Sequence, residues 1–122
     1  MSEILVVEDS PTQREQLLFL LQRAGYETIA APDGAAALEL ARARRPALVL
    51  TDVVMPRMDG PALVREVREL HPDMKVIFIS GYTEDAFRQR LDSDSEIHFL
   101  PKPFSLRQLA SKVKEVISGE MV

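Results

Sequence analysis

Several polar residues stand where short apolar runs of the sequence end. The run at 4–7 leads into Glu8 and Asp9, and the run at 47–51 leads into Asp52. Two later runs lead to Ser80 and, after a proline, to Lys102. Three carboxylates that lie close together repel one another, so a bound cation would stabilise them. Ligation by oxygen alone favours a hard divalent ion, and magnesium is the natural candidate.

Such a site could handle a phosphoryl group. Lys102 could neutralise it as a point charge, and Ser80 could donate a hydrogen bond to it. Asp52 could act as the nucleophile and form an aspartyl phosphate. Taken alone, Asp52 is equally well explained as a turn residue. Lys102 has the alternative of a solvated surface lysine, but the prolines on both sides hold its position and favour a functional role. The repeated appearance of polar residues at the ends of apolar runs favours a functional site.

The apolar runs indicate which elements position these residues. They are too short for buried helices and are typical of strands buried on both faces. Strands are expected at 4–7, 26–31, 47–52, 75–80 and 97–100, and helices at 11–24, 35–45, 61–70, 83–91 and 106–118. This alternation predicts an α/β fold in three layers, a doubly wound, five-stranded parallel sheet. Right-handed crossovers place the carboxyl ends of all strands on one rim.

Local signals mark several element ends. Ser10 and Ser105 are expected as N-caps of the first and last helices, and Gly25 as a left-handed cap. His71 lies in a predicted turn and is expected to be exposed. The apolar stripe of the third helix is predicted to be Leu63, Val64, Val67 and Leu70.

Composition limits the classes of function. The chain has 122 residues, enough for one compact domain, and a net charge of −4, which argues against direct nucleic-acid binding. It has no cysteine, so thiol catalysis and thiolate metal sites are excluded. No run approaches the length of a membrane helix and no signal peptide is evident, so a cytoplasmic, membrane-free protein is expected.

Four motifs together resemble those of the response-regulator receiver domain of two-component signalling, the CheY-like superfamily. They are Glu8-Asp9, Asp52 with the segment 55–60, Ser80-Gly81, and the segment 99–104. The resemblance covers roughly 4–117, so 1–122 is interpreted as one receiver domain without an output domain. It implies a flavodoxin-like (βα)5 fold with strand order 2-1-3-4-5.

The resemblance also implies roles for the residues at the metal site. Asp52 would be the phosphoacceptor. Glu8 and Asp9 would form the acidic pair that holds Mg²⁺, with Mn²⁺ as a possible substitute. Asp9 and Asp52 would be direct ligands, and the backbone carbonyl of Val54 a third.

Further residues are assigned to switching and to timing. Ser80 would be the switch hydroxyl, Lys102 would pair with the phosphoryl group, and Phe99 would turn inward when the hydroxyl moves. Val54 and Tyr82 occupy positions that tune the rate of phosphoryl loss. Tyr82 either shields the acyl phosphate from water or simply lies on the surface, and the sequence leaves both open.

The implied activity is self-catalysed transfer of a phosphoryl group from phosphohistidine to Asp52, followed by slow hydrolysis, rather than conventional enzymatic turnover. The donor would be a histidine kinase or a histidine phosphotransfer protein. The switching surface would be helix 4, strand 5 and helix 5, about 83–117, which would bind a downstream protein or a second copy of the chain.

Two rival functions differ from a receiver at identifiable positions. A haloacid-dehalogenase-type phosphatase needs a second Asp two residues after its nucleophile, where this chain has Val54. A receiver-like binding module that is never phosphorylated usually lacks one of the acids or the lysine. The biological context stays open among a stand-alone regulator, the receiver of a hybrid histidine kinase, which the segments 80–87 and 98–104 favour, and part of a longer regulator.

Overall fold

A computed structural model of the chain describes residues 3–52, 60–80, 97–101 and 104–118. Its centre is a sheet of five parallel strands in the order β2-β1-β3-β4-β5. The strands are β1 (Glu3–Val7), β2 (Glu27–Ala31), β3 (Leu48–Asp52), β4 (Lys75–Ser80) and β5 (Ile97–Pro101). The expected fold class and strand order are therefore confirmed.

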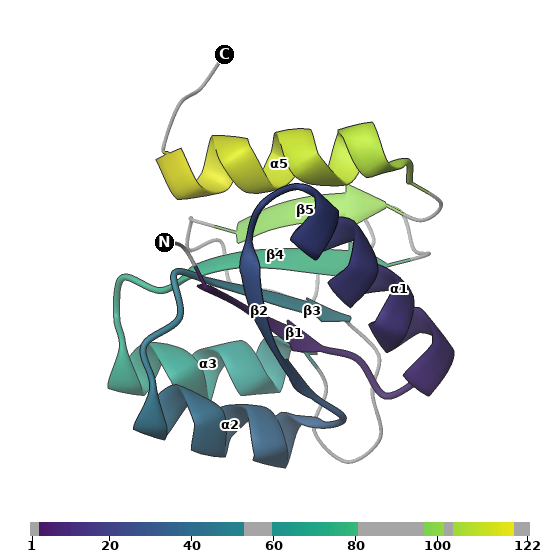
Figure 1. Cartoon of the computed structure of the whole chain (residues 1–122). Helices are drawn as coiled ribbons and strands as arrows, with labels where there is room; N and C mark the ends of the chain where they lie inside the picture. The colour runs from purple at the N-terminus through teal and green to yellow at the C-terminus, as the bar shows by residue number, and fades with distance from the viewer. Residues whose placement is uncertain (1–2, 53–59, 81–96, 102–103, 119–122) are drawn as a thin grey trace.

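Helices cover both faces of the sheet (Figure 1). Helices α1 (Pro11–Arg23) and α5 (Leu106–Ser118) pack on one face, and α2 (Gly34–Ala43) and α3 (Gly60–Leu70) pack on the other. The helix expected at 83–91 lies outside the described residues. Within the described part of the chain, no helix is long and apolar enough to cross a membrane.

The core consists of two apolar layers, one on each side of the sheet. Successive strand residues point to opposite faces, so Leu5 and Val7 join the layer under α2 and α3, while Ile4 and Val6 join the layer under α1 and α5. The predicted stripe of α3 is buried except at Leu70, the last residue of the helix, which is 40% exposed. Burial on both faces explains why the central strands are continuously apolar.

Helix ends follow the local signals, with one exception. Ser10 accepts a hydrogen bond from the Gln13 amide, and Gly25 has a φ of 96° just after α1. Ser105 and Gln108 exchange side-chain to backbone bonds of 3.1 and 2.8 Å at the start of α5. Helix α2, expected to reach residue 45, stops at Ala43. The residue before Pro46 is disfavoured in helical conformation, so the chain becomes extended there.

At the amino ends of the strands, side chains from one element bind the backbone or a side chain of another. His71 Nε2 lies 2.8 Å from the Ala41 carbonyl oxygen in α2, and Lys75 Nζ donates to the Ile117 carbonyl in α5 at 2.7 Å. Arg44 forms a 2.6 Å ion pair with Glu3. His71 is therefore half-buried and bonded rather than an exposed turn residue, because it meets the last turn of a neighbouring helix.

Candidate functional site

The register of the sheet gathers the predicted site residues at the carboxyl rim. Val7 of β1 is level with Thr51 of β3, so the residues that follow them, Glu8 and Asp52, leave neighbouring strands at the same height. Asp52 is in turn level with Ile79, the residue before Ser80. Ligands of open parallel sheets bind outside this rim.

Asp52 is the last residue of β3 and is half-buried. Its carbonyl oxygen accepts a 3.0 Å hydrogen bond from the hydroxyl of Thr51, which is fully buried. Gly60 approaches the same carbonyl so closely that a Cβ on residue 60 would collide with it, and would also lie 2.9 Å from the Phe78 ring. The Asp52 backbone is thus packed on two sides, and its carboxylate stands at the rim on a rigid base.

Glu8 is a buried acid at the rim. It is only 2% exposed, and its Oε2 accepts a 3.2 Å hydrogen bond from the Ser10 amide. Its own amide donates to the Ala31 carbonyl at 3.2 Å, which extends the β1–β2 pairing by one residue. Buried carboxylates are costly unless hydrogen-bonded. Glu8 is therefore held in place, whereas Asp9 beside it is exposed.

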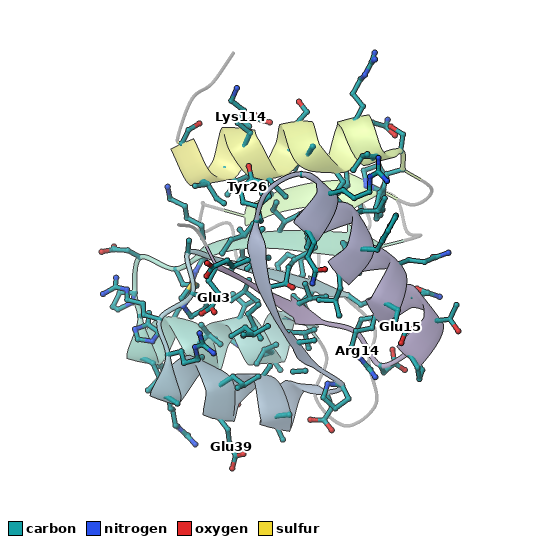
Figure 2. The ribbon with its side chains drawn as sticks, in the orientation of Figure 1. Glu3, Arg14, Glu15, Tyr26, Glu39 and Lys114 are labelled. Carbon is teal, nitrogen blue, oxygen red and sulfur yellow. The ribbon has the colours of Figure 1, made fainter. Side chains whose placement is uncertain are left out.

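Arg14 contacts this acidic segment, which the sequence reasoning missed. Its Nη1 donates a 2.9 Å hydrogen bond to the Glu8 carbonyl oxygen. Figure 2 shows Arg14 in the first turns of α1, next to the chain that leaves β1. A basic residue near a helix amino terminus opposes the helix dipole, and this mismatch was the available signal.

Switch and rate-tuning positions are only partly within the described residues. Phe99 is 8% exposed and belongs to the core layer under α2 and α3. Ser80 ends β4, level with Pro101 of β5, which places it at the rim. The predicted residues Lys102, Val54 and Tyr82 lie outside the described part, so their roles stay predictions.

The described acids fit a cation that needs few protein ligands. Among the described residues, no three His, Cys, Asp or Glu side chains form a group that could hold a metal ion. Mg²⁺ does not require such a group, because it binds one or two carboxylates and keeps several waters. The exposed Asp9, next to Glu8, which the Ser10 amide holds, and Asp52 at the adjacent strand end supply an oxygen-only donor set of that kind.

An apolar pocket of about 590 Å³ lies between α1 and the residues that precede α5. It is lined by Gln13, Gln16, Leu17, Phe19, Leu20, Ile79 and Phe104. Phe19 is 59% exposed, with the Arg23 guanidinium 5.5 Å from its ring centroid. Ile79 is level with Asp52 in the sheet, so the pocket reaches the rim that carries the acids.

The sequence reasoning did not single out Phe19. It stands two residues from both Leu17 and Leu21, which are buried. A displacement of two residues turns a helix by about 200°, so Phe19 faces away from the core. A large aromatic residue on the polar side of an amphipathic helix is the signal that marks it.

The fold and the rim geometry define a doubly wound α/β domain with acids at the carboxyl rim of its sheet, and comparison with known proteins identifies the family. The model for the response regulator receiver domain matches residues 4–114. The chain therefore belongs to the response-regulator receiver family of two-component systems, which comprises signalling domains that work with histidine kinases or phosphotransfer proteins.

Relatives occur in two settings. The chain is 49% identical over 119 residues to the sensor kinase CckA of Brucella abortus, covering 96% of this chain and 13% of the relative. It is 37% identical to the response regulator receiver protein CpdR of Brucella abortus, covering 96% of this chain and 98% of the relative. The receiver domain of the hybrid histidine kinase CckA superposes with a TM-score of 0.81 at 36% identity, covering 95% of this chain and 99% of that one. The similarity to hybrid-kinase receivers is thus confirmed.

Proposed function

We propose that this receiver accepts a phosphoryl group on Asp52 and uses it as a signalling switch. The observation that carries the proposal is the position of Asp52, half-buried at the carboxyl end of β3 and level with Glu8 on the neighbouring strand. A phosphoacceptor carboxylate must be accessible to the donor. It must also lie close to other acids, so that it can bind a cation together with them. The family membership supports the same assignment.

In the proposed reaction a carboxylate oxygen of Asp52 attacks phosphorus of a phosphohistidine. The P–O bond forms as the P–N bond breaks, and the bonding pair leaves with the imidazole nitrogen of the donor. Water later hydrolyses the acyl phosphate and restores the carboxylate. The chain itself supplies orientation and charge, so the transfer is self-catalysed.

Asp9, Asp52 and the Val54 carbonyl would hold Mg²⁺ or Mn²⁺, and Glu8 would support Asp9. When bound, the ion would neutralise charge on the phosphoryl oxygens. Lys102 would contribute a second positive charge from the end of β5. Ser80 would donate to a phosphoryl oxygen, and Phe99, which already packs in the core layer under α2 and α3, would occupy the inward position that accompanies this contact. Val54 and Tyr82 would set the lifetime of the acyl phosphate.

Two surfaces would communicate with partners. The phosphoryl donor, a cytoplasmic histidine kinase or phosphotransfer protein, must cover the carboxyl rim to reach Asp52. The pocket beside Phe19 borders that rim and offers an apolar surface on which the phosphoryl donor would bind. The second surface, the segment 83–117, would change after phosphorylation and bind a downstream protein or a second copy.

Intact-mass analysis tests the acceptor. The wild-type chain and Asp52→Asn are incubated with acetyl phosphate and Mg²⁺, and a parallel wild-type sample contains a chelator. We expect a gain of one phosphoryl group only in the wild type with Mg²⁺, because the amide cannot act as the nucleophile.

An equal gain in Asp52→Asn would refute the assignment of the acceptor. No gain in any sample, together with no binding of beryllofluoride, would instead favour the receiver-like module that is never phosphorylated.

A further inference from the structure

Arg14 holds the peptide that links the two acids of the rim. Its Nη1 donates to the Glu8 carbonyl at 2.9 Å, and this carbonyl belongs to the Glu8–Asp9 peptide group. The backbone amide of Arg14 also donates to the Ser10 carbonyl at 2.8 Å. The Ser10 amide in turn donates to the Glu8 carboxylate. Arg14 and the Glu8 side chain therefore both fix the backbone of the segment 8–10.

The charge of Arg14 does not serve its own helix. Helix α1 has no acidic residue in its first turn, where acids stabilise a helix, and its other basic residue near an end is Arg23 in the last turn. A cation in the early turns is unfavourable for the helix. The guanidinium instead reaches back past the helix start to the Glu8 carbonyl. The hydrogen bond therefore stabilises the loop before α1 and not the helix.

We infer that Arg14 is a positioning residue for the proposed metal site: it fixes the Glu8–Asp9 peptide and thereby orients Asp9 toward the cation. The inference rests on the proposed function, since it assumes that Asp9 and Asp52 bind Mg²⁺. An outer partner that orients a ligand commonly controls metal affinity.

Two effects of Arg14 on the metal would have opposite signs. Fixing the peptide keeps Asp9 ready to bind and strengthens affinity for Mg²⁺. The positive charge repels the cation and weakens it. We expect the orienting effect on Mg²⁺ affinity to exceed the charge repulsion. The guanidinium donates to the Glu8 backbone carbonyl, which carries the peptide that leads to the ligand Asp9.

Mg²⁺ affinity of three variants separates these effects. Arg14→Ala and Arg14→Gln remove both the charge and the reach to the Glu8 carbonyl, whereas Arg14→Lys keeps the charge and a donor of similar reach. Isothermal titration with MgCl₂ gives the dissociation constant, and amide chemical shifts of Asp9 and Ser10 report the loop. Arg23→Ala, at the other end of α1, is the matched control for net charge.

We expect Arg14→Ala and Arg14→Gln to bind Mg²⁺ about fivefold more weakly, the effect of losing one ordinary hydrogen bond. Arg14→Lys should recover most of the affinity, and Arg23→Ala should bind like the wild type.

Equal or tighter Mg²⁺ binding by both neutral variants would overturn the inference, since charge would then dominate. Equal losses in Arg14→Ala and Arg23→Ala would overturn it as well. Wild-type binding that Asp52→Asn weakens upholds the proposed site whatever the Arg14 variants do. Absence of Mg²⁺ binding by the wild type would overturn the site and the role of Arg14 together.

Discussion

Two acids at the rim, Glu8 and Asp52, are held in place by different hydrogen bonds. Glu8 is held through its own carboxylate by the Ser10 amide, whereas Asp52 is held through its carbonyl and leaves its carboxylate at the rim. A buried acid fixed by hydrogen bonds suits a supporting role. A half-buried acid on a packed backbone suits a reacting one.

Thr51→Val tests the support of Asp52. The substitution keeps the branched shape but removes the hydroxyl that donates to the Asp52 carbonyl. Because Thr51 is fully buried, we expect the free energy of unfolding in urea to fall by about 1 kcal/mol. Thr28 lies in the edge strand β2, and its hydroxyl accepts a hydrogen bond from the Gln22 side chain at the surface. Thr28→Val should therefore change the free energy of unfolding by less than about 0.5 kcal/mol. Equal losses in both variants would contradict this account.

Residue types at the rim were predictable, but their supports were not. Glu8, Asp9 and Asp52 follow apolar runs, and strand ends are readable from sequence. The Arg14 contact and the Thr51 hydroxyl bond depend on side-chain rotamers, and no pattern in the sequence specifies those. Lys102, Val54 and Tyr82 remain predictions from the family resemblance.

Elements begin and end largely where local chemistry dictates. The five strands lie within a residue of their predicted starts and ends, because each is a short apolar run bounded by turn residues. Helix α2 ended two residues early, since the restriction before Pro46 acts further back than the apolar pattern indicates. The spacing of Leu63, Val64 and Val67 predicted the buried face of α3 well.

Gly60→Ala tests how α3 meets the end of β3. An added Cβ would strike the Asp52 carbonyl and the Phe78 ring, so helix and strand must separate. We expect a loss of about 1–3 kcal/mol in unfolding free energy, as for other overpacked sites. The initial rate of labelling by acetyl phosphate should fall with it, because the base under Asp52 shifts.

Gly25→Ala is the matched control for this substitution. Its φ of 96° makes alanine unfavourable by roughly 1–2 kcal/mol, yet it lies at the opposite end of α1 from the acids. It should lose stability and keep the labelling rate of the wild type. A normal labelling rate in Gly60→Ala would show that Asp52 tolerates movement of α3.

At the scale of the whole molecule, the described residues include an apolar surface that leads to the rim carrying the acids. Phe19 stands 59% exposed on α1 above the pocket that reaches Ile79, the neighbour of Asp52 in register. Periodicity in the sequence does not specify the order of the strands, which came from the family resemblance. For the same reason, periodicity did not indicate that α1 lies near the residues before α5.

Phe19→Ser tests whether this approach guides the phosphoryl donor. With a sensor kinase or phosphotransfer protein that labels the wild-type chain, we expect the KM for the donor to rise about tenfold, the effect of losing an aromatic anchor. Labelling by acetyl phosphate should not change, because Phe19 does not touch the acids. Leu70→Ser, an exposed apolar residue of α3, is the matched control. Equal effects of both variants on the protein donor would refute the docking site.

Two side-chain to backbone bonds and one ion pair at the amino ends of the strands give the domain two unequal ends. His71, Lys75 and Arg44 tie helices and strands together there without touching the rim that carries the acids. The bonds at the amino end can accordingly keep the frame of the domain while exposed residues beside the rim, such as Phe19, are substituted. For a protein engineer, this makes the rim a region in which partner preference can be rewritten, and the amino end a region to leave unchanged.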